Sequence, residues 1–202
     1  MMFWKTGCNC FQIIEFSLTR TLSKTISVLD PKGPQKEKEK FYHALLSGML
    51  VGNGTWGILS NRESGDGFAD LIVETDNPDS GIIIELKSVG SLSELDRACE
   101  RAMSQIHDRR YDQYLRNEGR NDIWAYGIAF FKKRCKVVAE KLNDARLLAV
   151  ASERMAHFNP SSLISEEEMN HSACSCVSRL ELSPPPCYNI SRVFTKFEEV
   201  FP

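Results

Sequence analysis

The sequence of 202 residues lacks any long apolar run and any recognisable export signal. A membrane-spanning helix needs ~20 consecutive apolar residues, and no stretch approaches that length. Lys5 directly follows the N-terminal Met-Met-Phe-Trp, which does not resemble the apolar region of a secretory signal peptide. We therefore expect a soluble, intracellular protein without a membrane partner.

A regular cysteine framework is also missing. The seven cysteines are an odd number, and their spacings follow no disulfide pattern. For an intracellular chain this predicts reduced thiols. Four residues near the C-terminus could be drawn as a zinc site, but the Cys-x-Cys step is short and the flanking sequence looks disordered, so we do not favour it. These four are His171, Cys174, Cys176 and Cys187.

The chain has no excess of basic residues. Its 25 Lys and Arg are balanced by 27 Asp and Glu, which gives a net charge of −2 and a pI near 6.1. There is thus no global basic signature of a nucleic-acid-binding protein. A local patch stays possible, because basic residues gather between positions 97 and 134. They are interleaved with acidic residues, which is more typical of a solvated surface.

Composition divides the chain into three parts. With 42% hydrophobic residues it can form one core with tails. Residues 1–24 are a mildly apolar N-terminal extension that could form one helix or strand. Residues 25–140 contain the clearly patterned elements. Residues 141–202 include a region rich in Ser, Pro and Cys, and we expect this C-terminal tail to be partly disordered.

Two apolar segments in the middle of the chain have charged residues within them. Residues 82–87, Ile-Ile-Ile-Glu-Leu-Lys, form a β-branched run typical of a core strand. Side chains alternate across a strand, so Glu85 and Lys87 project to the same side. Residues 68–73 form a second predicted strand, with Asp70 near its start. Because buried charges need a partner or an ion, this constellation indicates a site for a divalent cation.

The remaining elements follow from periodicity and turn signals. Short loops between three adjacent strands predict an antiparallel meander. A capping box at Ser91-Leu92-Ser93-Glu94 predicts the start of a long helix, which we expect to end before Gly119. The other predicted elements are a helix at 41–51, a first strand at 56–61, a central strand at 122–131 and a short strand at 135–138.

Two polar residues lie on the inner stripes of the predicted helices. His43 shares a stripe with Glu39, Leu46 and Leu50 at steps of three and four residues. It is either a core-edge imidazole bonded to a carbonyl or a functional group. Gln105 lies on the apolar stripe of the long helix, and it is either a satisfied core amide or a group that faces a site.

At these residues the sequence resembles the PD-(D/E)xK nuclease superfamily. The likeness runs from about Thr25 to Val138 and includes, in order, SNRESGDGFADLIV, GIIIELK, AMSQI and YGIAFFKKRCKVV. It is similar to a branch that usually lies C-terminal to an AAA-ATPase-like domain, which implies an AAA-ATPase-like partner. The implied fold is α/β and restriction-endonuclease-like: a helix, a three-strand antiparallel meander, a helix, and a fourth strand parallel to the third.

The resemblance implies a nuclease that acts on DNA with Mg²⁺ or Mn²⁺. Asp70 and Glu85 would hold the cation together with the backbone carbonyl of Leu86. Mg²⁺ usually takes one or two carboxylates and keeps several waters, which suits this set. Lys87 would orient the attacking water or stabilise the charge that develops on the phosphorane.

Further residues enter the site only through the resemblance. Gln105 matches a glutamine on the helix that follows the strand pair, and His43 matches a first-helix His or Glu that flanks the metal. Tyr111 resembles a tyrosine often found after that glutamine. It lies six residues on, about 240° around a continuous helix, so we do not predict that it faces the site.

Two alternatives are left open. Glu85 and Lys87 also fit a structural cross-strand ion pair at the edge of a sheet. The domain would then be a catalytically inactive nuclease-fold module that binds proteins or nucleic acid.

Overall fold

The structure is a computed structural model that describes residues 10–52 and 54–142. The candidate zinc residues, and the predicted C-terminal tail from residue 143 on, lie outside this range. None of the described helices has the length and apolar composition needed to cross a membrane. The elements in chain order are α1 (Cys10–Thr25), α2 (Gln35–Val51), β1 (Gly57–Ser64), β2 (Gly67–Glu74), β3 (Ser80–Ser88), a 3-10 turn (Leu92–Glu94), α3 (Leu95–Asp108), α4 (Gln113–Asn117), β4 (Asp122–Phe131) and β5 (Arg134–Leu142).

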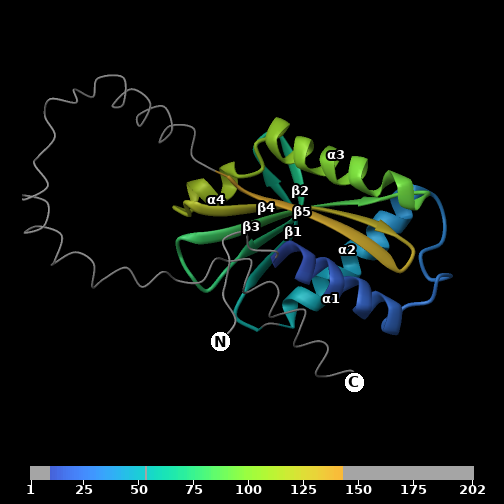
Figure 1. Ribbon diagram of the computed structural model, residues 1–202. Coiled ribbons are helices and arrows are strands. Elements are labelled where there is room, and N and C mark those ends of the chain that lie inside the picture. The colour runs from blue at the N-terminus through green and yellow to red at the C-terminus, as the bar shows by residue number, and fades with distance from the viewer. Residues whose placement is uncertain (1–9, 53, 143–202) are drawn as a thin grey trace, which may run out of the picture. The chain divides into compact units, whose positions relative to one another are not determined.

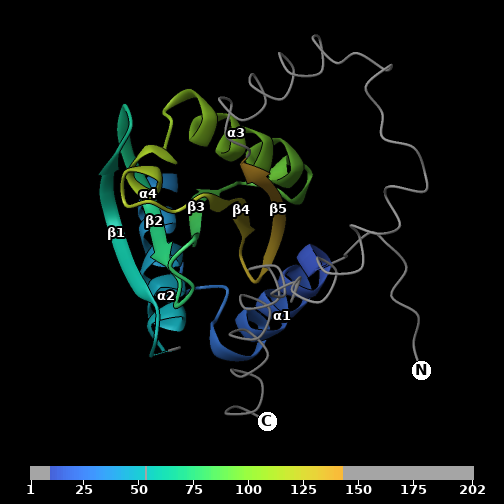
Figure 2. The same ribbon diagram turned by 90° about the vertical axis from the view of Figure 1, so that its left-hand side faces the viewer.

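The strands form one sheet (Figure 1), and Figure 2 shows their order β1-β2-β3-β4-β5. β1, β2 and β3 are an antiparallel meander, and β4 pairs with β3 in parallel after the crossover through α3 and α4. The predicted restriction-endonuclease-like α/β fold is therefore confirmed. β5 is longer than predicted, because its antiparallel pairing with β4 continues as far as Leu142.

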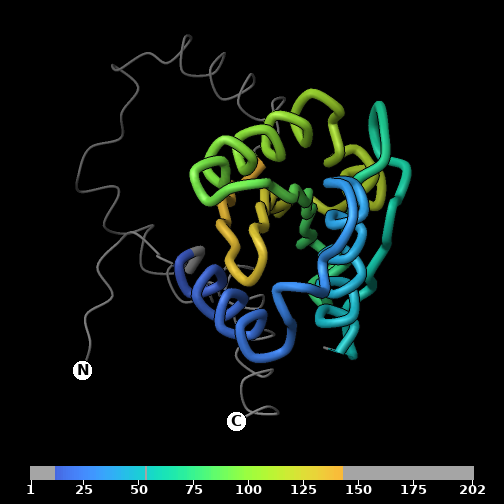
Figure 3. The backbone as a smooth tube through the Cα atoms, turned by 90° about the vertical axis from the view of Figure 1, so that its right-hand side faces the viewer, coloured from blue at the N-terminus to red at the C-terminus, as the bar shows by residue number. Residues whose placement is uncertain are grey.

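Helices cover both faces of the sheet. Figures 2 and 3 show α3 on one side and α1 and α2 on the other. Alternate side chains of β3 pack against the helices on the two faces of the sheet. Ile82, Ile84 and Leu86 pack toward α1 and α2, and Ile83 packs on the opposite face. β3 is buried on both faces, as expected of a strand in parallel pairing.

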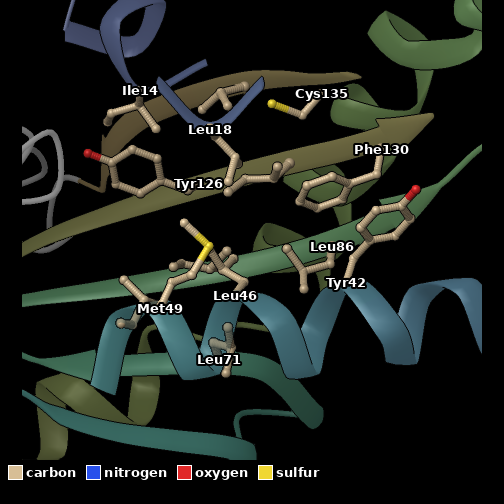
Figure 4. Packing of buried hydrophobic residues seen from close by; sticks show 14 of the residues in the cluster. Ile14, Leu18, Tyr42, Leu46, Met49, Leu71, Leu86, Tyr126, Phe130 and Cys135 are labelled. Carbon is tan, nitrogen blue, oxygen red and sulfur yellow. The ribbon is translucent and has the colours of Figure 1, made fainter. Parts of the chain in front are cut away.

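The larger core lies between the sheet and the α1–α2 layer (Figure 4). Tyr42 of α2 stacks on Phe130 of β4, with ring centroids 4.3 Å apart. The Tyr42 hydroxyl donates to the Lys132 carbonyl at 2.6 Å, so its polar end is satisfied at the rim of the core. This packing fixes α2 against the sheet.

α1 covers the outer edge of the sheet. Ile14, Leu18 and Leu22 are buried in the larger core. β5 is an edge strand, and α1 side chains bond two of its N–H groups: that of Cys135 donates to Thr19 at 3.4 Å, and that of Val137 donates to Glu15 at 3.1 Å. The helix thus satisfies backbone groups that an open edge would leave free.

α3 approaches the sheet closely at Gly127. A Cβ added there would lie 2.9 Å from the Cys99 carbonyl oxygen and 3.2 Å from Ala102 Cβ. Any side chain at this position would push the helix away. Gly127 pairs with Glu85 of β3, so the close approach occurs beside a candidate site residue.

The long helix ends earlier than predicted. It follows the 3-10 turn after Ser91 as expected but stops at Asp108, and α4 is a separate short helix. Arg110 has a φ of 51°, in the left-handed region that ends a helix.

The β1–β2 turn holds this break in place. The Asp66 N–H donates to the Arg109 carbonyl at 2.8 Å, and the Arg110 guanidinium pairs with the Asp66 carboxylate at 3.0 Å. Gly65 packs directly on the same backbone, where a Cβ would collide with the Arg109 carbonyl. A contact between distant segments therefore decides where α3 stops.

Candidate active site

β2 and β3 separate at one end, and the gap between them defines a fork. Their pairing stops at Leu71 and Ile84, although β3 continues for four more residues. The Leu86 N–H, which no longer meets a β2 carbonyl, donates to Oδ2 of Asp70 at 2.8 Å. Because the N–H and C=O of a strand residue point to the same side, the Leu86 carbonyl also faces the fork. The fork therefore brings the Asp70 carboxylate and a backbone oxygen together.

A second carboxylate reaches the fork from α2. The Ser88 N–H, next along the same edge of β3, donates to Oε1 of Glu39 at 3.0 Å. Sequence reasoning placed Glu39 on the inner stripe with His43 but did not include it among the site residues. Its acidic side chain at that inner position was the available signal.

Asp70 lies at an irregular point of β2. The ladder with β1 skips the position of Asn61, which has a φ of 48°. Ala69 and Ile72 both pack on the α3 side, so the side-chain alternation of β2 shifts at Asp70. Simple alternation along the sequence could not have shown this shift, which directs the Asp70 carboxylate to β3.

His43 contacts the backbone of Asp70 rather than its carboxylate. Its Nε2 lies 2.9 Å from the Asp70 carbonyl oxygen, so this nitrogen carries the hydrogen. The Ser60 hydroxyl lies 3.3 Å from the same nitrogen. The contact is that of an imidazole at the core edge bonded to a carbonyl, and it fixes Asp70 at the point where the β1 ladder is interrupted.

A chain of hydrogen bonds links three of the predicted residues. Lys87 Nζ donates to Oε1 of Glu85 and to Oε1 of Gln105, each at 2.8 Å. Gln105 Nε2 in turn donates to the Tyr111 hydroxyl at 3.0 Å. We did not predict this contact from the sequence, because the angle of about 240° applies to a helix that continues through Tyr111, whereas α3 ends at Asp108.

Glu85 is a buried carboxylate with one unsatisfied oxygen. Its residue is 2% exposed, and Oε2 accepts no hydrogen bond from the described residues. Burial, and after it the negative charge of Asp70, raise the pKa of Glu85 to about 7 against the opposing effect of Lys87. The two carboxylates therefore lie close enough to repel each other.

The donor set at the fork fits a hard divalent cation. Asp70, Glu85 and the Leu86 carbonyl supply only oxygen, which Mg²⁺ and Mn²⁺ prefer. A cation would relieve both the repulsion and the unsatisfied Glu85 oxygen. Among residues 10–52 and 54–142, no group of three or more His, Cys, Asp or Glu side chains is arranged to hold a metal. The rest of the coordination shell would come from backbone and water oxygens.

An open cleft of about 930 Å³ borders the site. Lys87 and Gln105 line it at the end nearest Glu85. Arg97 and Arg101 of α3 line it further along, and Phe68 of β2 lines it as well. The cleft gives solvent access to the Lys87 ammonium.

Comparison with known proteins gives one family. The sequence model of the PD-(D/E)XK nuclease superfamily matches residues 37–140, about half of the chain, including every site residue described above. No curated protein matches the chain. A solved structure described as "Crystal structure of SSO0001" is 16% identical, with 91% of each chain covered and a TM-score of 0.31.

Proposed function

Because the chain belongs to the PD-(D/E)XK nuclease superfamily, we propose that it is a metal-dependent nuclease that hydrolyses phosphodiester bonds in DNA. The observation that supports this most strongly is the fork. There Asp70 bonds the backbone of β3 at 2.8 Å, and Glu85 has a buried oxygen without a partner. Two carboxylates that repel each other, beside a lysine, suit a site that gains stability from a cation.

Asp70, Glu85 and the Leu86 carbonyl would hold Mg²⁺ or Mn²⁺. When bound, such a cation polarises a phosphoryl oxygen and lowers the pKa of a water. Asp70 keeps its orientation through the Leu86 N–H, and Glu85 keeps its orientation through Lys87. The chain therefore needs little rearrangement to present these oxygens.

Lys87 is placed to act on the attacking water or on the phosphoryl oxygens. An ammonium has three N–H donors, and two of them are committed to Glu85 and Gln105. No described residue accepts from the third, which would reach a water or a phosphoryl oxygen and stabilise developing negative charge. Gln105 acts as a positioning residue, and Tyr111 holds its amide in the orientation that accepts from Lys87.

His43 and Glu39 support the site from α2. Neither contacts the carboxylates of Asp70 or Glu85 through its side chain; they bond the Asp70 carbonyl and the Ser88 N–H. We assign both as positioning residues that hold the two branches of the fork.

The decisive experiment is cleavage of supercoiled and linear DNA by the purified protein with Mg²⁺ or Mn²⁺. Cleavage should stop on addition of EDTA. Lys87→Ala should also lose cleavage, while the two cations still raise its melting temperature because the ammonium is not a ligand. Glu85→Gln, purified in the same way, controls for a contaminating nuclease.

A second function is favoured by the ion pair itself. Lys87 and Glu85 already neutralise each other at 2.8 Å, and the described residues contain no side-chain metal cluster of three. This suits an inactive nuclease-fold module that binds partners. Two results together would establish the inactive module. Adding Mg²⁺ or Mn²⁺ would leave the melting temperature of the wild type unchanged, and Lys87→Ala and Glu85→Gln would both melt at lower temperatures than the wild type.

A further inference from the structure

Phe68 is an exposed aromatic residue on the wall of the cleft. It is 62% exposed, although Leu71, Ile72 and Val73 of the same strand are fully buried. It lies two residues before Asp70, about 7 Å along an extended strand. An exposed ring at this place offers a flat surface on which a nucleobase can stack.

Arg97 and Arg101 form a cationic row on α3, which also lines the cleft. With Gln105 they follow at four-residue steps along α3, so each step advances about 6 Å along the helix axis. This is comparable to the spacing of successive phosphates in an extended polynucleotide strand. Both arginines are exposed, and neither has a hydrogen bond or ion pair with the described residues. The row ends at Gln105, whose amide holds Lys87.

The exposed Phe68 ring favours a single strand. The cleft is open to solvent rather than enclosed, so a polynucleotide strand can lie in it without being threaded through the protein. In a duplex the faces of the bases are covered by their neighbours, so stacking on Phe68 requires an unpaired or extruded base.

We propose that this cleft binds single-stranded DNA, with one base stacked on Phe68 and successive phosphates held by Arg97 and Arg101. The proposal rests on the proposed nuclease function for its ligand class. It assigns the substrate as a single strand, or an unpaired region of a duplex, that enters the fork beside Lys87.

Acidic residues elsewhere in the cleft restrict the attraction for phosphates to the row of Arg97 and Arg101. Glu100 and Asp108 also line the cleft, and both are exposed on α3. Asp66 lines it too, but its carboxylate is paired with Arg110. A second backbone lying across the cleft would meet Glu100 and Asp108, which have no ion pair with any described residue, and this again disfavours a duplex.

The test measures binding of a fluorescently labelled oligothymidylate in EDTA, where no metal-dependent cleavage occurs. The wild-type protein should bind it at least about tenfold more tightly than a blunt hairpin duplex, because only the single strand offers a free base face. Phe68→Ala should weaken binding by about tenfold and leave its salt dependence unchanged.

The double variant Arg97→Ala/Arg101→Ala should change the salt dependence instead. Each lost phosphate contact lowers the slope of log K against log salt by about 0.7 for single strands, so we expect a reduction of about 1.4. Phe16→Ala and Arg20→Ala/Lys24→Ala are the matched controls, since these α1 residues are exposed on the other side of the sheet. Neither control should alter affinity or slope.

Equal affinity for duplex and single strand would overturn the proposal. So would a Phe68→Ala variant that binds like Phe16→Ala, or an unchanged slope in the arginine variant. Because these measurements exclude metal, a protein that shows the expected binding but never cleaves DNA overturns only the nuclease function. A protein that cleaves DNA but binds both forms equally overturns only the single-strand site.

Discussion

The two halves of the β2–β3 pair use the same backbone geometry for opposite purposes. In the paired half, which ends at Leu71 and Ile84, backbone groups bond each other and the side chains are buried and mainly apolar. In the fork, the N–H groups of Leu86 and Ser88 bond carboxylates from other elements. Where the strands separate, unsatisfied backbone donors therefore attract and orient acidic side chains.

The comparison teaches where stability and chemistry reside. The paired half contributes apolar packing and buries no charged side chain. The fork keeps Glu85 at 2% exposure with one unsatisfied oxygen and a raised pKa of about 7, which is unfavourable for the metal-free fold. Changes in the two halves should therefore separate activity from stability.

The largest effect is expected for Glu85→Gln. Cleavage with Mg²⁺ should fall by about 10²–10³-fold, because the neutral amide is a poor partner for the cation. The melting temperature of the metal-free protein should stay the same or rise, since the repulsion with Asp70 is removed. Cleavage assays and thermal melts on one preparation check both. A large loss of stability would instead assign Glu85 to a structural ion pair.

In the paired half, Leu71→Ala should lower the free energy of unfolding by about 3–5 kcal/mol, because Leu71 is fully buried and leaves a cavity. Urea denaturation measures this. The folded fraction should still cleave DNA within a few-fold of wild type. Leu29→Ala is the matched control, since Leu29 is 66% exposed. If Leu71→Ala abolished cleavage while fully folded, the separation of the two halves would fail.

The pH dependence of the free energy of unfolding should reflect the protonation of Glu85 at the fork. Glu85 has a pKa of about 7 in the folded protein against an ordinary 4.5, so the folded state retains a proton that the unfolded state has lost. The free energy of unfolding of the metal-free protein should therefore fall as pH rises from about 4.5 to about 7, by on the order of 3 kcal/mol.

Urea titrations across this pH range, on wild type and Glu85→Gln, provide the measurement. Glu85→Gln should lose this part of the decline, because an amide does not titrate. An identical decline in both proteins would place its origin elsewhere in the molecule.

The smallest effect is expected for Glu39→Gln. The amide oxygen can still accept from the Ser88 N–H but loses the charge of the carboxylate, so stability should fall by about 1 kcal/mol or less. Glu37→Gln, an exposed acid on the same helix, is the matched control and should have no effect. Chemical denaturation of both variants distinguishes a contact at the fork from a general change in charge.

Much of the fold followed from local patterns. The β-branched run of β3 and the apolar run of β4 are strong strand signals, although their parallel pairing was implied by the family resemblance and not by these patterns. The phase of α3 also placed Gln105 on the side of Lys87, 2.8 Å from it. These features depend on residues close to one another in the sequence.

The features that were missed depend on distant segments. α3 ends at Asp108 because the β1–β2 turn bonds Arg109 and Arg110, and no glycine or proline marks that point. Glu39 reaches the fork because β2 leaves β3 at Leu71, which no periodicity encodes. Local sequence thus specifies the elements, whereas the irregularities that shape the site arise only when they meet.

The contact between α1 and β5 determines how this sheet can meet another chain. Sheets polymerise by adding strands at their edges, and here Glu15 and Thr19 occupy donors that an incoming strand would need. At the opposite edge, left-handed Asn61 interrupts β1, and Arg62 and Glu63 are exposed beside it. One edge is thus covered by a helix and the other is irregular and charged. This combination protects the protein from edge-to-edge aggregation and leaves the cleft uncovered.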